Sequence, residues 1–139
     1  FSRQAGVTEN TVFLGAYAYA LAKYTGQSEA LLATVNNGRH DPRMNHTLGM
    51  LVRTLPVYLS IDEEETVAGF LENLQSRFFE TMSHDCCSFG ELAREYGVTS
   101  DLLFVYQAQT LNSVTLDGAE VPMEALETGN SLANIALHV

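Results

Sequence analysis

The sequence predicts a mixed α/β layered domain, and three kinds of pattern lead to that prediction. Amphipathic helical stretches, short apolar runs of strand length and turn-rich segments follow one another along the 139 residues. Their order is helix, strand, strand, helix, helix and then further strands, which is typical of a mixed sheet with helices packed on it. Hydrophobic residues make up 46% of the chain and charged residues 17%, so the composition is that of a globular protein.

The first helix is expected to run from about Thr8 to Tyr24, with the Thr8 hydroxyl as its cap and Gly26 at its exit. Apolar side chains recur along it at helical spacing, which predicts the face that is buried. That face carries Phe13, Tyr17, Ala20, Leu21 and Tyr24. The alanines on the far side indicate close packing against another element.

Two further helices are expected in the middle of the chain. One follows the four acids at 62–65, which complement the positive end of its dipole, and Thr66 is its cap. Its apolar stripe consists of Val67, Phe70, Leu71, Leu74, Phe78 and Met82. The next helix begins at a capping box formed by Ser88 and Glu91 and stops at Gly97. Its buried face is expected to carry Leu92, Ala93 and Tyr96.

Strands are predicted on both sides of these helices. Leu31 to Val35 is a short apolar run before the turn-rich Asn36-Asn37-Gly38, and the loop continues to about His46. A second extended segment is expected from Met50 to Ile61, where Pro56 must lie at a position that needs no ladder donor. The later strands are Leu102–Gln107, Ser113–Leu116 and Glu120–Met123 around the tight turn Asp117-Gly118, and Leu132–Val139.

Charge and composition exclude several classes of function. Seven Lys and Arg residues against seventeen Asp and Glu residues give a net charge of −10, which argues against a nucleic-acid partner. No apolar run approaches the roughly 20 residues of a membrane helix, and no signal peptide is visible. Cys86 and Cys87 are adjacent, so a disulfide between them would be strained, and reduced thiols in a cytoplasmic protein are expected.

Two polar clusters are candidates for sites of chemistry. His40, Asp41 and His46 could bind a metal, but no helix face or cysteine pair organises them, so we expect a solvated loop and no metal site. His84-Asp85-Cys86 invites a nucleophile hypothesis, yet catalytic partners usually meet from distant chain positions. We therefore expect buried or half-buried structural thiols at Cys86 and Cys87.

Six segments match, in order and spacing, the motifs of one known family. They are Leu21–Gln27, similar to L-x-R-Y-T-G-Q; Thr34–Arg39, similar to a strand ending in S-G-R; Leu48–Val57, similar to I-G-x-F-V-N-T-L-P; His84–Leu92, similar to H-Q-D-Y-P-F-E-x-L; Leu102–Gln107, similar to the strand after N-P-L-F; and Ser131–Val139, similar to F-D-L-x-L. Over essentially its whole length the chain thus resembles the condensation domain of nonribosomal peptide synthetases.

The resemblance implies one lobe of a two-lobed fold similar to chloramphenicol acetyltransferase, with a tunnel between the lobes. The implied reaction is attack of an acceptor amine on a donor thioester, both carried on the phosphopantetheine of carrier proteins, with no cofactor bound directly. The family's catalytic H-H-x-x-x-D-G motif does not occur in this sequence. Because the chain starts at Phe1 and ends within a predicted strand, we expect a partial domain covering 1–139, truncated at both ends and inactive alone. Its expected partners are the missing N-terminal lobe, peptidyl carrier proteins and an adenylation domain, and the isolated chain is expected to self-associate.

The resemblance also selects candidate residues with structural or tunnel-lining roles. These are Arg39, Gly49, Arg53, Thr54 and His84. Arg39 is the candidate for pairing with the motif aspartate, since arginine binds a carboxylate in a planar, bidentate manner. The alternative for Arg39 is a loop arginine in solvent, and for His84 a residue that caps a helix end.

The sequence departs from the family motifs, and these departures leave other functions open. Arg53 stands where the motif has Asn, Cys86-Cys87-Ser88 replace D-Y-P, and Asp101-Leu102 stands where N-P is usual. One alternative is an epimerisation-type or other acyltransferase lobe of the same fold. Another is a non-catalytic module that docks carrier proteins, although the acidic charge argues against it because carrier proteins are themselves acidic.

Overall fold

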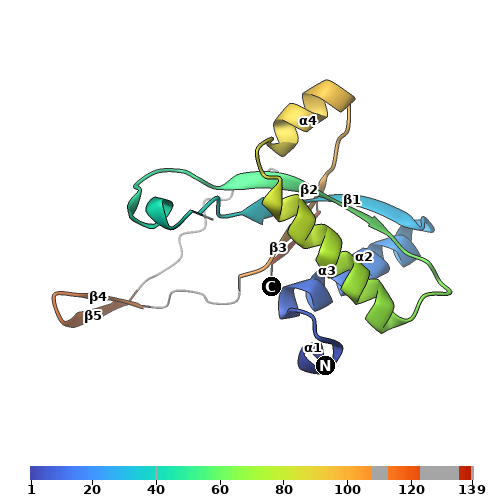
Figure 1. Ribbon diagram of the computed structural model, residues 1–139, viewed down its shortest axis with the longest axis horizontal. Helices are drawn as coiled ribbons and strands as arrows, with labels where there is room; N and C mark the ends of the chain where they lie inside the picture. Colours follow the sequence, from blue (N-terminus) through green and yellow to red (C-terminus); the bar gives the residue numbers. More distant parts are fainter. Residues whose placement is uncertain (40, 108–112, 123–134, 139) are drawn as a thin grey trace.

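A four-stranded mixed sheet forms the centre of the protein (Figure 1). The computed structural model describes residues 1–39, 41–107, 113–122 and 135–138. The strand order is β2-β1-β3-β6, with bounds β1 Glu29–Asn36, β2 Arg53–Ser60, β3 Leu102–Val105 and β6 Ile135–His138. β1 pairs with β2 antiparallel and with β3 parallel, and β3 pairs with β6 parallel. The predicted mixed sheet is therefore confirmed.

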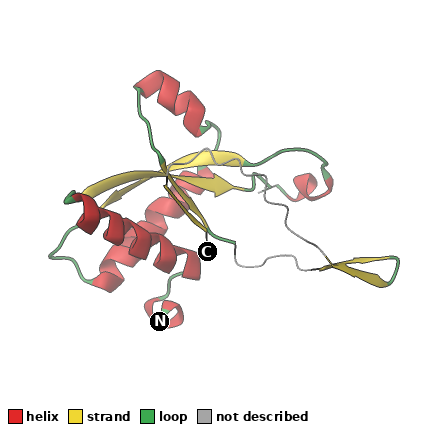
Figure 2. Cartoon of the chain, turned by 180° about the vertical axis from the view of Figure 1, so that it is seen from behind, coloured by secondary structure: helices red, strands yellow, loops and turns green. Residues whose placement is uncertain are grey.

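Helices lie on both faces of this sheet. After the short α1 (Ser2–Ala5), the long helices α2 (Glu9–Thr25) and α3 (Val67–Ser83) cover one face, and α4 (Phe89–Tyr96) lies on the other (Figure 2). Thr8, Thr66 and Ser88 cap α2, α3 and α4 with their hydroxyls, as expected from the sequence. Within the described residues, no helix combines the length and apolar character that crossing a membrane requires.

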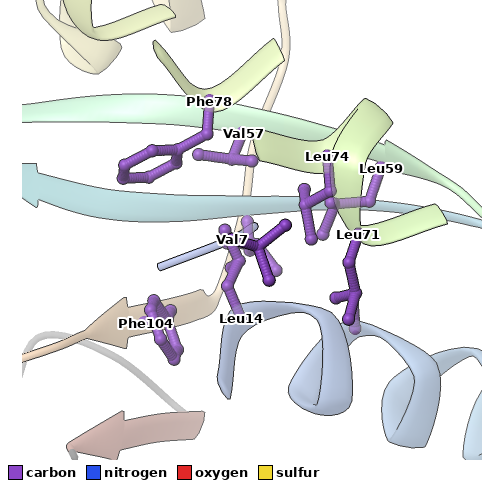
Figure 3. Close-up of a cluster of buried hydrophobic side chains, with 10 residues drawn as sticks. Val7, Leu14, Val57, Leu59, Leu71, Leu74, Phe78 and Phe104 are labelled. Carbon is purple, nitrogen blue, oxygen red and sulfur yellow. The ribbon is translucent and has the colours of Figure 1, made fainter. Parts of the chain in front are cut away.

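The core lies between the sheet and the pair α2 and α3. Figure 3 shows side chains from α2, α3, β2 and β3 converging there, together with Val7 from the α1–α2 connection. In β2 the residues Leu55, Val57 and Leu59 are buried while Thr54 and Tyr58 are exposed, which is the period of two of a strand with one covered face. Full burial of each such side chain contributes about 1.5–3 kcal/mol. The buried members of the cluster are Val7, Leu14, Ala18, Leu32, Val57, Leu59, Leu71, Leu74, Phe78 and Phe104.

The predicted buried face of α2 was wrong. Thr11, Leu14, Gly15, Ala18 and Ala22 are its buried residues. Three residues of the predicted face are exposed: Ala20, Phe13 at 42% and Tyr24 at 90%. The reason is steric: a Cβ on Gly15 would lie 2.5 Å from Leu71 Cδ2, so small residues are what allow α3 to approach this closely. Tyr17 remains partly buried beside the core and stacks on Phe104, with ring centroids 6.1 Å apart.

Several element boundaries also differ from the expected ones. β1 begins at Glu29, before the apolar run, because it pairs with β2 as far as Ser60. β2 begins at Arg53 rather than at Met50. Part of the expected loop forms a short 3₁₀ helix, η1 (Pro42–His46), capped by Asp41. The carboxylate of Asp41 accepts from the side chain of Arg43, which holds the pKa of Asp41 below its ordinary value.

The predicted hairpin is present as a two-stranded sheet of β4 (Ser113–Leu116) and β5 (Ala119–Pro122). Asp117 and Gly118 both have positive φ angles, 48° and 78°, as the predicted tight turn requires. The hairpin projects away from the main sheet (Figure 1). Met123, residues 132–134 and Val139, which were assigned to strands from the sequence, lie outside the described residues.

Candidate functional site

The candidate residues gather at one end of the β1–β2 pair. Asn36 ends β1 and lies opposite Arg53, the first residue of β2, in the antiparallel register. Next along β2, Thr54 pairs with Val35 and is exposed. The connection that carries Arg39 and Gly49 leaves from this end of the sheet, and the turn between α3 and α4 crosses it.

Asp85 joins the turn between α3 and α4 to this end of the sheet. The Arg53 guanidinium donates to the backbone carbonyl of Asp85, and its Nη1 lies 4.0 Å from the Asp85 carboxylate. Asn36 Nδ2 donates to Asp85 Oδ2 over 3.1 Å, and Asn36 is itself 6% exposed. A buried amide with a charged acceptor is a stronger contact than a neutral pair. This Asn36–Arg53–Asp85 brace fixes the turn relative to both strands.

Arg39 organises the β1–β2 connection from inside. Its Nη1 donates to the carbonyls of Met44 and Thr47 over 2.5 and 3.0 Å, and its Nη2 donates to the carbonyl of Gly49 over 3.4 Å. Through these bonds three backbone carbonyls of the segment 44–49 face the same guanidinium, which holds the segment in a curved conformation. The Nε–H makes no hydrogen bond within the described part of the chain, so one edge of the group remains available.

Two glycines shape the same connection. Gly38 has φ 66°, and a Cβ there would lie 2.0 Å from the Leu51 carbonyl oxygen, so the backbone passes where no larger residue fits. Gly49 has φ 151°, a conformation that other residues rarely adopt. Between this connection and the brace lies a cavity of about 370 Å³, lined in part by Met44, Met50 and Arg53.

His84 ends α3 and lies on the wall of a second hollow. Its Nδ1 is 2.9 Å from the Glu80 carbonyl and 3.0 Å from the Ser83 hydroxyl, which is a helix-end contact. The hollow is a groove of about 700 Å³ between α3, α4 and β2, with Pro56, Leu92 and Tyr96 among its apolar lining residues. The helix-capping alternative for His84 thus has a structural basis.

The structure bears differently on the two polar clusters considered from the sequence, the histidine loop around His40 and the segment His84-Asp85-Cys86. His40 lies outside the described residues, and among those that the structure describes no group of three His, Cys, Asp or Glu could hold a metal ion. The expectation of buried or half-buried thiols was wrong, because Cys86 and Cys87 are both exposed and free. The turn that carries them is held from the backbone and from Asp85, so it needs no burial of the sulfur atoms.

Asn36 and Asp85 were not among the candidate residues. Asn36 is the polar residue at the end of an apolar strand. Its position in the strand pattern is only a weak indication that its side chain is buried. Asp85 was considered only as a neighbour of His84. Its partners lie 49 and 32 residues away, which no local pattern reveals.

Comparison with solved structures identifies the class of fold. The chain superposes with a TM-score of 0.72 and 21% identity on the first condensation domain of the CDA synthetase, over 84% of this chain and 27% of that one. It superposes with a TM-score of 0.74 and 16% identity on holo-AB3403, a four-domain nonribosomal peptide synthetase, over 93% of this chain and 11% of the other. The fold is that of one part of a condensation domain.

The family follows from sequence. The Condensation domain model matches residues 1–134, so the chain belongs to the condensation domain family. Chondramide synthase cmdD of Chondromyces crocatus is 30% identical over 80% of this chain, and tyrocidine synthase 3 of Brevibacillus parabrevis is 28% identical over 92%. The chain spans 3% and 2% of the lengths of these two relatives.

Proposed function

We propose that this chain is one part of a condensation domain that forms amide bonds between aminoacyl and peptidyl thioesters carried on the phosphopantetheine of carrier proteins. The match of the family model to residues 1–134 carries this proposal. The relatives are synthases of many times this length, which supports a multidomain parent with carrier and adenylation domains as partners. No cofactor is needed on this chain itself.

Within that function the chain supplies tunnel wall and surface on the acceptor side. The reacting histidine of the family motif would come from the other lobe, because no two of the four histidines in this sequence are adjacent. The 139 residues alone are therefore inactive. The end of the β1–β2 pair, where Arg39, Gly49, Arg53 and Thr54 gather, is the part of this chain that faces the other lobe.

Arg39 is the positioning residue for the motif aspartate in this proposal. Its two terminal nitrogens hold the β1–β2 connection through three backbone carbonyls. The remaining Nε edge suits a carboxylate, because guanidinium and carboxylate meet in one plane. One arginine would then tie the catalytic loop of one lobe to the connection of the other.

The test begins with the coding sequence that precedes Phe1. We expect an H-H-x-x-x-D-G motif there, one subdomain away, and amide formation when both parts are expressed as one polypeptide and supplied with carrier-bound substrates. The 139-residue chain alone, assayed in parallel, should give no product above background. A motif-free upstream region, or product from the short chain, would contradict the proposal.

In the joined protein, Arg39→Ala should lower kcat more than Arg39→Lys, while Arg43→Ala serves as the matched control.

The β1–β2 connection also predicts self-association of the isolated chain. Leu48 is 100% exposed, Met50 88% and Val52 48%, so apolar side chains project along one short segment. Exposed apolar patches of this kind mark surfaces that pack against a partner. We expect concentration-dependent association in sedimentation, reduced in a Leu48→Ser/Met50→Ser variant. A strictly monomeric chain at high concentration would overturn this prediction.

A further inference from the structure

We propose that the turn between α3 and α4 presents Cys86 and Cys87 as a preorganised chelating site for a soft, thiophilic divalent metal ion. Both thiols are exposed and free, and they are the two cysteines of the sequence. Their sulfur atoms are 4.0 Å apart. This inference does not depend on the condensation reaction.

The distance between the two sulfur atoms fits a shared metal. Two metal–sulfur bonds of about 2.3 Å at a tetrahedral angle place their sulfur atoms roughly 3.8 Å apart. Cys86 and Cys87 therefore need little movement to bind one ion together. Thiolate ligands select soft ions, while hard ions such as Mg²⁺ and Ca²⁺ take oxygen ligands. Because the protein supplies two ligands, water or an added thiol completes the coordination shell.

Contacts at three points hold the turn that carries the thiols. At its start, the His84 amide donates to the carbonyls of Glu80 and Thr81, both over 3.2 Å. In the middle, the Asn36–Arg53–Asp85 brace ties Asp85 to the ends of β1 and β2. At its end, the capping box of Ser88 and Glu91 begins α4. The two cysteines lie between the second and third points, and Cys86 Sγ itself donates to the His84 carbonyl over 3.7 Å.

Cadmium is a suitable probe because its bond to thiolate is followed by ultraviolet charge-transfer absorbance. The reduced 139-residue chain is titrated with Cd²⁺, and so is a peptide of residues 82–91, which has the same two thiols without the fold. We expect one Cd²⁺ per folded chain, bound at least about tenfold more tightly than by the peptide, because preorganised ligands lose less entropy on binding. Equal affinity of chain and peptide would refute the preorganised site.

Variants separate chelation from other forms of thiol binding. Cys86→Ser and Cys87→Ser should each weaken Cd²⁺ binding by about a hundredfold, because the second ligand binds intramolecularly. Single variants that bind as tightly as the parent chain, or two chains per Cd²⁺ in sedimentation, would overturn the proposal. Arg53→Ala removes the contacts between the Arg53 guanidinium and Asp85 without touching a sulfur atom and leaves the Asn36–Asp85 hydrogen bond in place, so it should move the affinity part of the way towards that of the peptide. Arg77→Ala changes an exposed α3 residue that makes none of the described contacts holding the turn, and it is the matched control.

Discussion

α3 and α4 begin from equally clear capping signals, but they bury very different shares of their apolar faces. Thr66 accepts from the Gly69 amide at the start of α3, and Ser88 accepts from the Glu91 amide at the start of α4. α3 buries Leu71, Leu74 and Phe78. In the described structure α4 buries none of its residues, and Tyr96, which was predicted on its buried face, is 69% exposed.

The difference lies in what each helix meets. α3 packs between α2 and the sheet, so its stripe has apolar neighbours on two sides. α4 lies against β2 from the other face and leaves the groove lined by Leu92 and Tyr96 open. Local sequence thus determines where a helix starts and stops, while the number of layers around it determines how much it stabilises the fold.

Removing a leucine from each helix should give the largest contrast. Leu74→Ala leaves a cavity in the core, where Leu74 is 3% exposed, and should lower the free energy of unfolding by about 2–5 kcal/mol. Leu92→Ala removes a half-buried side chain and should cost about 1 kcal/mol or less. Urea unfolding measures both. Leu74→Met, which keeps the volume, should cost under about 1.5 kcal/mol, and similar losses for both alanine variants would contradict the comparison.

Adding a methyl group should change stability in opposite directions at two helical glycines. A Cβ at Gly15 of α2 meets Leu71, Phe70 and Leu74 within 3.3 Å, so Gly15→Ala overpacks the core by about 1–3 kcal/mol, partly offset by a gain in helix propensity of about 1 kcal/mol. At Gly90 of α4, apart from its chain neighbours and the backbone of the helix itself, no atom of the described residues lies within 4 Å of such a Cβ. Gly90→Ala should therefore stabilise the protein by up to about 0.5–1 kcal/mol. Thermal unfolding of both variants checks the signs, and a stabilised Gly15→Ala would show that Leu71 moves freely.

The smallest effect expected is a dependence of α4 on pH. Hydrogen bonds from the Ser88 amide and hydroxyl to the Glu91 carboxylate lower the pKa of Glu91 below its ordinary 4.5. A lowered folded pKa means that the contribution is present above about pH 4.5 and is lost as the pH falls through the folded value. Amide chemical shifts or hydrogen exchange of α4 should report fraying in that window before α3 is affected. Glu91→Gln should remove this pH dependence, and if it persists in that variant, another group is responsible.

Much of the fold could be predicted because its signals are local. Capping hydroxyls, the glycine stops and the extended segment that contains β2 depend on neighbours in sequence, and each is present in the structure. The buried face of α2 could be predicted only in part: the expected close packing of alanines is confirmed for Ala18 and Ala22, but the expected aromatic face is wrong. Phe13 and Tyr24 are larger and more apolar than Ala18 and Gly15, but the close approach of α3 selects small residues, and that approach is a property of the assembled layers.

The candidate site depends even more on contacts between distant parts of the chain, which local sequence does not reveal. Motif resemblance selected Arg39, Gly49 and Arg53, and the structure places them at one end of the β1–β2 pair. It could not reveal that Arg53 contacts Asp85, because the pairing depends on how the turn after α3 crosses the sheet. Roles that involve another lobe, as proposed for Arg39, lie beyond what either the sequence or the fold of this chain determines.

The position of Phe104 has a consequence for how the protein forms during synthesis. Phe104 is fully buried, and the Thr34 hydroxyl donates to its carbonyl across 70 positions of the chain. Pairing partners so distant in sequence slow folding, because a long loop must close before the contact contributes. Until residue 104 has been added, Leu14 and Leu32 lack the largest fully buried side chain of their cluster. The unfinished chain therefore exposes apolar surface until Phe104 joins the core.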